Sequence, residues 1–448
     1  MTHSFSDAVV SPAPINPEDV VVVIMGGGQG TRLYPLTRKR AKPAVSFGGK
    51  YRLVDIPITN CLNSQLNKIF ILTQFNSFSL NRHIWQSYGR EVGRDGFIDV
   101  VAAEQTVTST AWFQGTADAV RRSLQHILYH EPKYILILSG DQVYSMDYNF
   151  MFSFHQSHNA DVTIAAHYSS PEEISRLGIV KVDRDMQVID FFEKPENPAL
   201  IEEFRYADST SSVTGKPFLA SMGIYLFNTD SLLKALENNE TDFGKEIIPL
   251  AAKSMHMACF PFSGYWEDVG TIKTFYDANM EWLKGGGIAE LFQGGNSIIT
   301  HARQLPPARV HKTLVENSII SEGSIIHADR LKRSLIGVRS RIAGGCVIED
   351  SIIMGNTKIH GVENESLFDD SDDNDDTGTF LLKSCNRFEI GEGCTIKNAI
   401  LDKDVIIGKG SQIVNIRGVE EEENKLYVIR SGIVVIAQET VIPPGTII

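Results

Sequence analysis

A glycine-rich segment that ends in a basic residue is the first feature of the sequence able to do chemistry. It follows an apolar run at 20–25, and its key residues are Gly26, Gly27, Gly28, Gly30, Thr31 and Arg32. Consecutive glycines let backbone N–H groups approach an anion closely, and a guanidinium adds a permanent positive charge. The segment therefore predicts a phosphate-binding loop, although a plain strand-to-helix turn can have the same composition.

Two common phosphate-binding motifs are excluded. A Walker A loop requires Gly-Lys-Ser/Thr, which this segment lacks. A Rossmann fingerprint requires a third glycine at the position of Leu33.

Alternating strands and helices must hold this loop in place. Strand-like runs are expected at 20–25, 68–73, 134–138, 162–166 and 221–227, and an amphipathic helix at 117–130. This alternation predicts an α/β fold with an at least partly parallel sheet and helices on both sides. Ligands of such sheets bind at the carboxyl ends of the strands, so we expect the loops after Met25 and Leu138 to form a site.

The pattern changes near residue 300. Ile336, Ile342 and Ile348 are spaced by six residues, and so are the pairs Ile390/Ile396 and Ile407/Ile413. A six-residue period fits neither a helix nor an ordinary strand. It is typical of a β-helix in which each hexapeptide forms one face of a triangular coil and points its aliphatic residue inward.

Two neighbouring motifs carry a resemblance to a known family. Gly-Gly-x-Gly-Thr-Arg-Leu-x-Pro-Leu-Thr is followed closely by Lys42-Pro43, and the combination is similar to the signature of sugar nucleotidyltransferases. Further segments resemble the ADP-glucose pyrophosphorylases (glucose-1-phosphate adenylyltransferases), closest to the plant and cyanobacterial type: 39–61, 72–77, 112–119, 139–144, 192–195, 221–225 and 265–271. The resemblance implies a Rossmann-like (GT-A-like) nucleotidyltransferase domain at 18–290, a linker at 291–312 and a left-handed parallel β-helix at 313–448.

The resemblance also implies a reaction. A phosphate oxygen of glucose 1-phosphate attacks the α-phosphorus of ATP and expels pyrophosphate, giving ADP-glucose for glycogen- or starch-type synthesis. Because the nucleophile is already an anion, positioning and charge neutralisation must supply most of the catalysis. Arg32, Lys42 and Asp141 are the expected catalytic residues. Asp141 and Asp268 are expected to hold Mg²⁺, which one or two carboxylates can bind together with several waters.

Substrate contacts are assigned by the same resemblance. The nucleotide is expected to contact Gly26, Gly27, Gly28, Gly30, Thr31, Gln74, Gly115 and Asp118. Glucose 1-phosphate is expected to contact Phe113, Gly178, Glu193, Lys194 and Ser221, with Lys194 on its phosphate. Phe113 stands where bacterial members often carry Tyr, and Gln142 stands where many carry His.

A phosphorylated metabolite is a possible effector, because many family members are activated by one. The matching positions are Lys39, Arg40, Ser46, Arg52 and Lys403. Gln438 stands where the family pattern has a second C-terminal lysine, and a neutral amide cannot make the same charge-assisted contact.

Composition and charge limit the class of protein. The net charge of −13 argues against nucleic acid as the main partner. Eight acidic residues with no base between them indicate a solvated loop inserted at 361–386: Glu363, Glu365, Asp369, Asp370, Asp372, Asp373, Asp375 and Asp376. No apolar run at the N-terminus suggests a signal peptide or membrane span, and the five scattered cysteines suggest no disulfide framework, so a cytoplasmic location is expected.

Three alternatives stay open at this point. The chain could use another nucleotide such as UTP, it could be a regulatory subunit of a hetero-oligomer, or its hexapeptide tail could be an acyltransferase. Retention of Asp141, Lys194 and Asp268 argues against an idle subunit. His327 and His360 are the histidines among the repeats, and neither lies in an acyltransferase-like context. A homotetramer is expected, because the β-helix faces suit symmetric contacts.

Overall fold

The computed structural model describes residues 15–89, 96–103, 112–195, 197–206, 215–284, 297–357 and 388–448. The chain forms two compact units. Unit 1 comprises Met1–Gly28, Val54–Ser77 and Asn81–Trp266, and unit 2 comprises Gln29–Leu53, Phe78–Leu80 and Glu267–Ile448. The expected boundaries at 290 and 312 stay predictions, and the acidic segment at 361–386 lies outside the described residues.

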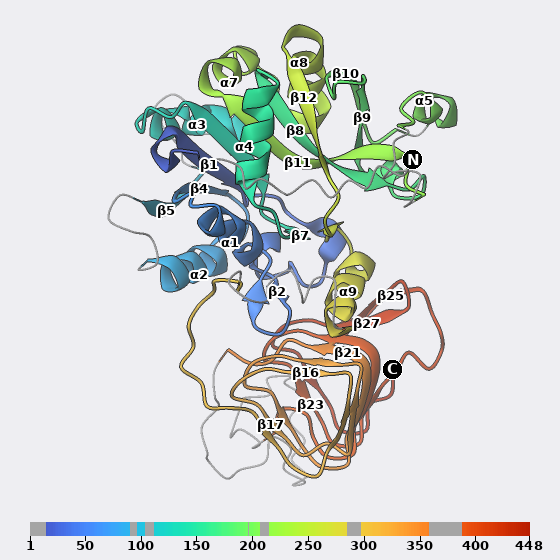
Figure 1. The fold of residues 1–448 in the computed structure, drawn as a ribbon. Coiled ribbons are helices and arrows are strands. Elements are labelled where there is room, and N and C mark those ends of the chain that lie inside the picture. The colour runs from blue at the N-terminus through green and yellow to red at the C-terminus, as the bar shows by residue number, and fades with distance from the viewer. Residues whose placement is uncertain are drawn as a thin grey trace, which may run out of the picture. The chain divides into compact units, whose positions relative to one another are not determined.

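Unit 1 is built on a mixed sheet that has nine strands in the described residues (Figure 1). The strand order is β10-β9-β11-β6-β1-β4-β5, and β8 pairs with both β11 and β12. The strands are β1 (Val20–Met25), β4 (Lys68–Thr73), β5 (Phe97–Ala102), β6 (Tyr134–Ser139), β8 (Val162–Ser169), β9 (Gly178–Val182), β10 (Val188–Glu193), β11 (Phe218–Asn228) and β12 (Met257–Phe262). Strands β1, β4, β5 and β6 are parallel, whereas β11 runs antiparallel to β6.

Helices pack against this sheet. Helix α3 packs on β1 and β4, α4 on β8 and β12, and α7 on β6 and β11. The helices that begin in the part of the chain assigned to unit 1 are α1 (Asp55–Asn63), α3 (Thr116–Leu128), α4 (Tyr148–Ser157), α5 (Pro198–Glu202), α7 (Thr229–Ala235) and α8 (Ile248–Ser254), and α2 (Phe78–Tyr88) spans both assignments. None of the helices in the described ranges is long and apolar enough to cross a membrane.

The expected α/β fold is confirmed. Strands β1 and β4 have the bounds that their apolar runs predict. Strands β6, β8 and β11 extend beyond the predicted runs, because Ser139, the residues 167–169 and the residues 218–220 continue the pairing. Helix α3 presents Val120 and Ile127 to the core, as its amphipathic pattern predicts.

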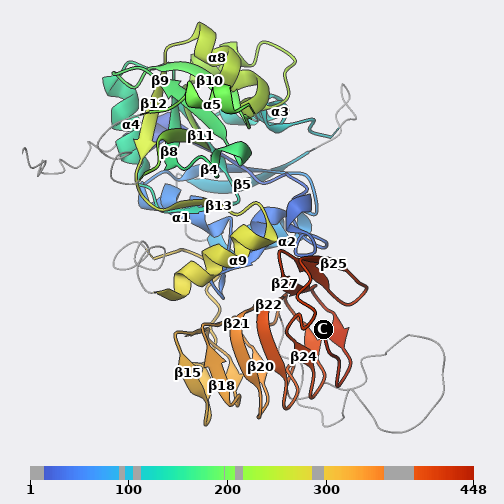
Figure 2. The same ribbon diagram turned by 90° about the vertical axis from the view of Figure 1, so that its right-hand side faces the viewer.

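The tail of unit 2 is a β-helix of stacked parallel strands (Figure 2). One face contains β14 (Arg309–Val310), β17 (Ile325–Ile326), β20 (Arg341–Ile342), β23 (Ile406–Ile407) and β28 (Val441–Ile442). The other two contain β15 (Leu314–Glu316), β16 (Ile319–Ile320), β18 (Arg330–Lys332), β19 (Leu335–Ile336), β21 (Val347–Ile353), β22 (Thr395–Leu401), β24 (Gln412–Ile413) and β27 (Ile433–Ile436). An antiparallel hairpin of β25 (Glu421–Glu423) and β26 (Val428–Arg430) joins β27.

The six-residue period is confirmed by this architecture. Ile336, Ile342 and Ile348 lie on three successive faces, and all three side chains are fully buried. Ile342 pairs with Ile390 in the next coil, and Ile348 pairs with Ile396. The coil register is therefore kept on both sides of residues 358–387.

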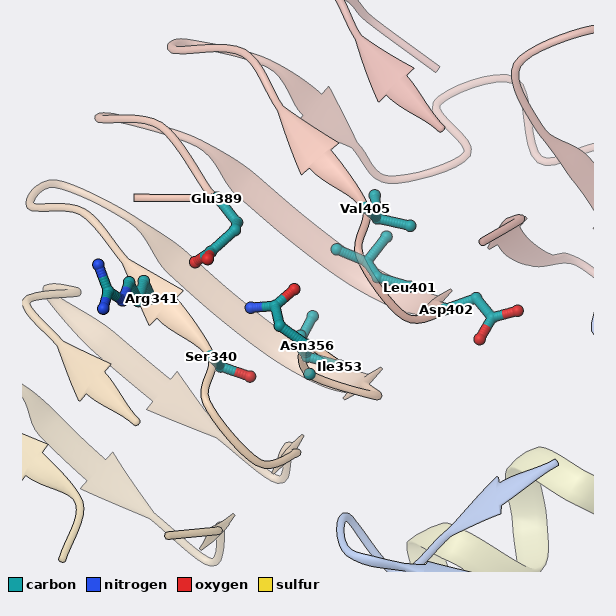
Figure 3. Close-up of a pocket in the computed structure, with 9 residues that line it drawn as sticks. Ser340, Arg341, Ile353, Asn356, Glu389, Leu401, Asp402 and Val405 are labelled. Atoms are coloured by element: carbon teal, nitrogen blue, oxygen red, sulfur yellow. The ribbon is translucent and has the colours of Figure 1, made fainter. Parts of the chain in front are cut away.

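A small pocket lies in the wall of the β-helix (Figure 3). Figure 3 shows the carboxylate of Glu389 pointing into the space that Ser340 and Asn356 also line. Its Oε2 atom is buried and has no hydrogen-bond partner in the described part of the chain. The pocket has room for about one water molecule. Burial raises the pKa of Glu389 to about 7, and nearby Arg341 only partly opposes the shift.

This raised pKa predicts a pH-dependent stability. A carboxyl whose pKa is higher in the folded state favours folding when protonated, so its cost grows as pH rises from about 4.5 to about 7. Glu389→Gln should therefore raise the unfolding temperature of unit 2 more at pH 8 than at pH 5. The cost removed is about 3 kcal/mol at most. Scanning calorimetry across this pH range measures the effect, and Glu392→Gln, an exposed neighbour, is the control. An equal effect of Glu389→Gln at both pH values would contradict the prediction.

Candidate active site

The glycine-rich segment begins at the carboxyl end of β1. This strand lies between β4 and β6, and both neighbours are parallel to it. The Gly26 N–H donates to the Leu72 carbonyl over 2.8 Å, and the Gly140 N–H donates to the Met25 carbonyl over 3.1 Å. The loops that follow β1, β4 and β6 are therefore tied together by backbone hydrogen bonds at one sheet edge.

This edge offers an open backbone to a ligand. A side chain at Gly28 would meet no atom within 4 Å, and one at Gly27 would lie 3.5 Å from the Gln74 Cβ. The Gln74 amide donates from Nε2 to the Phe113 carbonyl over 3.3 Å. Its Oε1 is buried without a partner among the described residues. This bond sets the orientation of the amide and leaves Oε1 as an acceptor whose partner is not among the described residues.

Asp141 follows β6 at the same edge. The Ser139 hydroxyl donates to its Oδ1 atom, which orients the carboxylate two residues after the strand. Gly26, Gly27, Gly28, Gln74 and Asp141 are thus brought together in unit 1, as the parallel arrangement predicts. Phe113 lies beside Gln74, and its assignment to the sugar phosphate stays a prediction.

The N-terminus of α3 carries Gly115 and Asp118. The Asp118 carboxylate accepts from the Gln114 N–H over 2.9 Å. A Cβ on Gly115 would lie only 2.3 Å from the Thr241 carbonyl oxygen. Only glycine permits this approach without moving the backbone.

Glu193 and Gly178 face each other across β9 and β10, where they are register partners. A Cβ on Gly178 would lie 2.7 Å from Glu193 Oε2, and one on Gly244 would lie 3.2 Å from the same oxygen. Two glycines therefore leave room for the carboxylate, which can accept hydrogen bonds from sugar hydroxyls.

Lys194 has a left-handed backbone with φ of 50°. This conformation is uncommon for a lysine, and Pro195 further restricts the residue before it. Lys194 Nζ lies 2.6 Å from Glu193 Oε1, and about half of its side chain is exposed. The strained turn holds an accessible ammonium next to the Glu193 carboxylate, as a phosphate-binding residue would require.

Ser221 lies at an irregularity of β11. The register with β8 shifts between Ser221 and Tyr225, and Gly223 has φ of 66°. Such bulges aim side chains away from the regular ladder. The Ser221 side chain is hydrogen-bonded to Tyr225, whose pKa is raised by burial.

Tyr225 and Asp242 were not identified from the sequence. The charges of Glu193 and Asp242 both act on Tyr225, so these residues belong to the same cluster as Ser221. Their sequence separation hides the relationship, and a tyrosine within a buried strand has no distinctive signal of its own.

A second group of predicted residues meets in unit 2. Lys42, which begins the short helix η3 (Lys42–Ala44), is buried, and its Nζ lies 3.6 Å from Asp268 Oδ1. A Cβ on Gly270 would lie 3.1 Å from Asp268 Oδ2 and 3.5 Å from an Arg32 guanidinium nitrogen. Gly30, with φ of 62°, packs against Lys42 before Thr31 begins η2 (Thr31–Leu33). The predicted catalytic cations thus lie beside the predicted second metal ligand.

The predicted effector residues also gather in unit 2. One Arg40 guanidinium nitrogen lies 2.7 and 2.6 Å from the two Asp402 carboxylate oxygens and 2.8 Å from Gln438 Oε1. Both charged side chains of the Arg40–Asp402 pair are buried. Lys39 and Glu439 form an exposed ion pair.

Lys403 is buried at the centre of this basic group. Burial lowers its pKa well below that of an ordinary lysine. The positive charges of Arg52, Arg303 and Arg40 lower it further, and Asp402 opposes the shift. Arg303 was missed in the sequence because it stands in an irregular segment without a motif.

Ser46 and Arg52 are direct partners in the ribbon of β2 (Ser46–Phe47) and β3 (Tyr51–Arg52). The Ser46 hydroxyl is buried and lacks a hydrogen-bond partner in the described part of the chain. An unsatisfied buried hydroxyl costs free energy, so this group is suited to a ligand that supplies the missing bond.

The donor chemistry fits Mg²⁺ in number and type. The described residues contain no group of three or more His, Cys, Asp or Glu side chains that could hold a metal ion. Magnesium differs from zinc in that one or two carboxylates suffice when waters and substrate phosphates complete the shell. Asp141 belongs to unit 1 and Asp268 to unit 2, so their joint role stays a prediction.

Comparison with protein families agrees with both parts of the chain. A family model described as nucleotidyl transferase matches residues 21–285. A second model, described as the GLGC left-handed parallel β-helix domain, matches residues 303–447. These matches confirm the predicted order of a nucleotidyltransferase region followed by a left-handed β-helix. The chain with this glycine-lined sheet edge therefore belongs to the nucleotidyl transferase family and carries a β-helix domain of the GLGC type.

Proposed function

We propose that this nucleotidyltransferase transfers AMP from ATP to glucose 1-phosphate, releasing pyrophosphate and ADP-glucose for α-glucan synthesis. The observation that carries the proposal is the sheet edge at which backbone hydrogen bonds from Gly26 to Leu72 and from Gly140 to Met25 hold together the strand ends that precede Gly27, Gln74 and Asp141. An edge of this kind binds nucleotide phosphates in open α/β sheets.

The nucleotide base is selected by hydrogen bonding. Adenine presents an amino donor, and the buried Gln74 Oε1 is an acceptor without a partner in the described residues. Uracil presents a carbonyl at the corresponding position, which this oxygen would repel. The same acceptor favours ATP over the alternative of UTP.

The sugar phosphate is held by the cluster on β9, β10 and β11. The Glu193 carboxylate and the Ser221 hydroxyl orient sugar hydroxyls, and Lys194 binds the phosphate that will attack. No proton needs to leave this nucleophile, so the cluster acts by orientation. Asp141 in unit 1 and Asp268 in unit 2 are the carboxylates that would hold Mg²⁺, which would supply charge neutralisation on the phosphates. Arg32 and Lys42 neutralise further negative charge that develops on the leaving pyrophosphate.

The Mg²⁺ ligands can be tested by removing one charge at a time. Asp141→Asn and Asp268→Asn should each lower kcat by several orders of magnitude, because neutralisation acts mainly in the transition state. Steady-state pyrophosphate release measures this loss. Asp230→Asn in unit 1 and Asp277→Asn in unit 2 remove exposed carboxylates and should leave kcat unchanged. Turnover close to that of the unmodified protein in either test variant would exclude the assignment.

The role of Lys194 predicts a selective loss of affinity. Lys194→Ala should raise the KM for glucose 1-phosphate by roughly ten- to a hundredfold and change the KM for ATP much less, because only the former loses a charge-assisted contact. Alanine carries the same left-handed backbone strain as lysine, so the variant removes little besides the ammonium. Lys234→Ala, on an exposed face of α7, is the control. Equal effects on both KM values would mean that Lys194 does not bind the sugar phosphate.

The basic group around Lys403 is proposed as an effector site for a phosphorylated metabolite. Arg40 is a buried guanidinium, the buried Lys403 amine can take up a proton when an anion binds, and Ser46 offers a hydroxyl. Gln438 already serves as an acceptor for Arg40, so activation should be weaker than with a lysine there.

The lowered pKa of Lys403 gives this site a pH dependence. An anion stabilises the protonated ammonium, so anion binding takes up a proton and the affinity falls as pH rises. Calorimetric titration with sulfate, which stays divalent across pH 6.5–8.5, should show an increasing Kd and proton uptake. Lys403→Arg should bind sulfate with a flatter pH profile, and the exposed Lys397→Gln should behave as the unmodified protein. Tight binding with no pH dependence would contradict the prediction.

A further inference from the structure

Two segments that carry different parts of the candidate site are joined at the N-terminus of α3. The Ala117 N–H donates to the Thr241 carbonyl over 2.8 Å, and the Asp118 N–H donates to the same carbonyl over 3.2 Å. The Thr116 hydroxyl accepts from the Phe243 N–H over 2.9 Å and lies 3.4 Å from Asp242 Oδ2.

The contact between 241–243 and the start of α3 provides the N-terminal cap that the helix does not have in its own sequence. The first turn of a helix has N–H groups without partners inside the helix. Gly115 precedes the helix and has no side chain to cap them, and no side-chain cap is present at this position. The Thr241 carbonyl therefore acts as an external cap, and the absence of a Cβ on Gly115 allows it to come close.

A single atom, the Thr116 hydroxyl oxygen, contacts both Asp242 and Phe243 from the start of α3. It accepts one hydrogen bond from backbone and is placed to donate another to the Asp242 carboxylate, which only a hydroxyl can do. Valine has the same shape but would leave the Phe243 N–H without this acceptor. Serine keeps the hydroxyl and loses only a methyl group.

Phe243 and Gly244 contact the residues around Glu193 and Ser221 that are predicted to bind the sugar phosphate. The Phe243 ring stacks on Tyr225 with centroids 5.8 Å apart, and the Tyr225 hydroxyl is bonded to Ser221. Gly244, the next residue, faces Glu193. Gly115 and Asp118, the predicted nucleotide contacts, lie at the start of α3. Residues 241–244 thus connect the start of α3 to the residues expected to bind the sugar.

We propose that Thr116 is a positioning residue that couples nucleotide binding at the start of α3 to sugar-phosphate binding at Glu193 and Ser221. The proposal rests on the proposed function, because it uses those two substrate assignments. A nucleotide bound at Gly115 and Asp118 stabilises the start of α3. The start of α3 in turn holds Asp242, Phe243 and Gly244 in the arrangement that fits the sugar phosphate. By thermodynamic reciprocity, the sugar phosphate strengthens nucleotide binding by the same factor.

Coupling is measured by calorimetric titration of glucose 1-phosphate with and without saturating α,β-methylene-ATP and Mg²⁺, since this analogue resists cleavage at the α-phosphorus. In the unmodified protein the analogue should tighten glucose 1-phosphate binding by about fivefold or more. Thr116→Val should reduce this factor toward one, while each ligand alone binds within about threefold of normal. Thr116→Ser should restore the coupling.

Ser123→Ala is the matched control, because it removes a hydroxyl on the same helix that donates to the Ala119 carbonyl within α3. Full coupling in Thr116→Val, or binding of both ligands without coupling in the unmodified protein, would overturn the proposal. If neither ligand binds the unmodified protein, the proposed function itself fails.

Hydrogen exchange provides a test that does not depend on the folding of Thr116→Val. The analogue with Mg²⁺ should slow exchange of the Phe243 amide in the unmodified protein and in Thr116→Ser, since the helix start and residues 241–243 become more rigid together. Unchanged exchange at Phe243 when the analogue is bound would overturn the proposal.

Discussion

The backbone ladder around β1 is the constraint on which the candidate site depends. Met25 is the register partner of Leu72 in β4 and of Ser139 in β6, so three parallel strands end at the same level. The glycine-rich segment, Gln74 and Asp141 are the residues that follow these ends. A one-residue slip of β1 would turn its buried valines to the opposite face and carry the glycines away from the other two loops. Burial of Val20–Ile24 therefore sets the geometry of this sheet edge as well as the stability of the sheet.

Glycines also allow close contacts near the residues that are predicted to bind the sugar phosphate. At Gly115 a carbonyl of Thr241 occupies the place of a side chain, and at Gly178 a carboxylate does so. The approach at Gly115 joins segments that are distant in the sequence, and a methyl group there would require the backbone to move. At Gly178 the side chains of Phe191 and Glu193 would have to move instead. The glycines of this site serve packing between segments as well as ligand access.

Local patterns in the sequence predicted the elements well, because those patterns directly reflect burial. The apolar runs at 20–25 and 68–73 give the bounds of β1 and β4, and Ile336, Ile342 and Ile348 fall on successive faces of the β-helix. The site was predicted mainly through resemblance, which assigns motif residues but not the groups that support them. Tyr225, Asp242 and Arg303 lacked a local signal, since their neighbours in space come from distant parts of the chain.

The effector candidate shows why charge can identify a site that packing does not explain. Among the described residues, Arg40, Arg52 and Arg303 surround the buried Lys403, and Asp402 is the carboxylate that offsets them there. Bringing several like charges close to a buried lysine is costly, so this arrangement is a poor way to stabilise a fold. The Arg40–Asp402 pair and the Gln438 acceptor reduce the imbalance around Arg40. The Lys39–Glu439 pair is exposed and contributes little to that balance. A bound anion would favour the protonated form of Lys403 and could accept a hydrogen bond from the Ser46 hydroxyl.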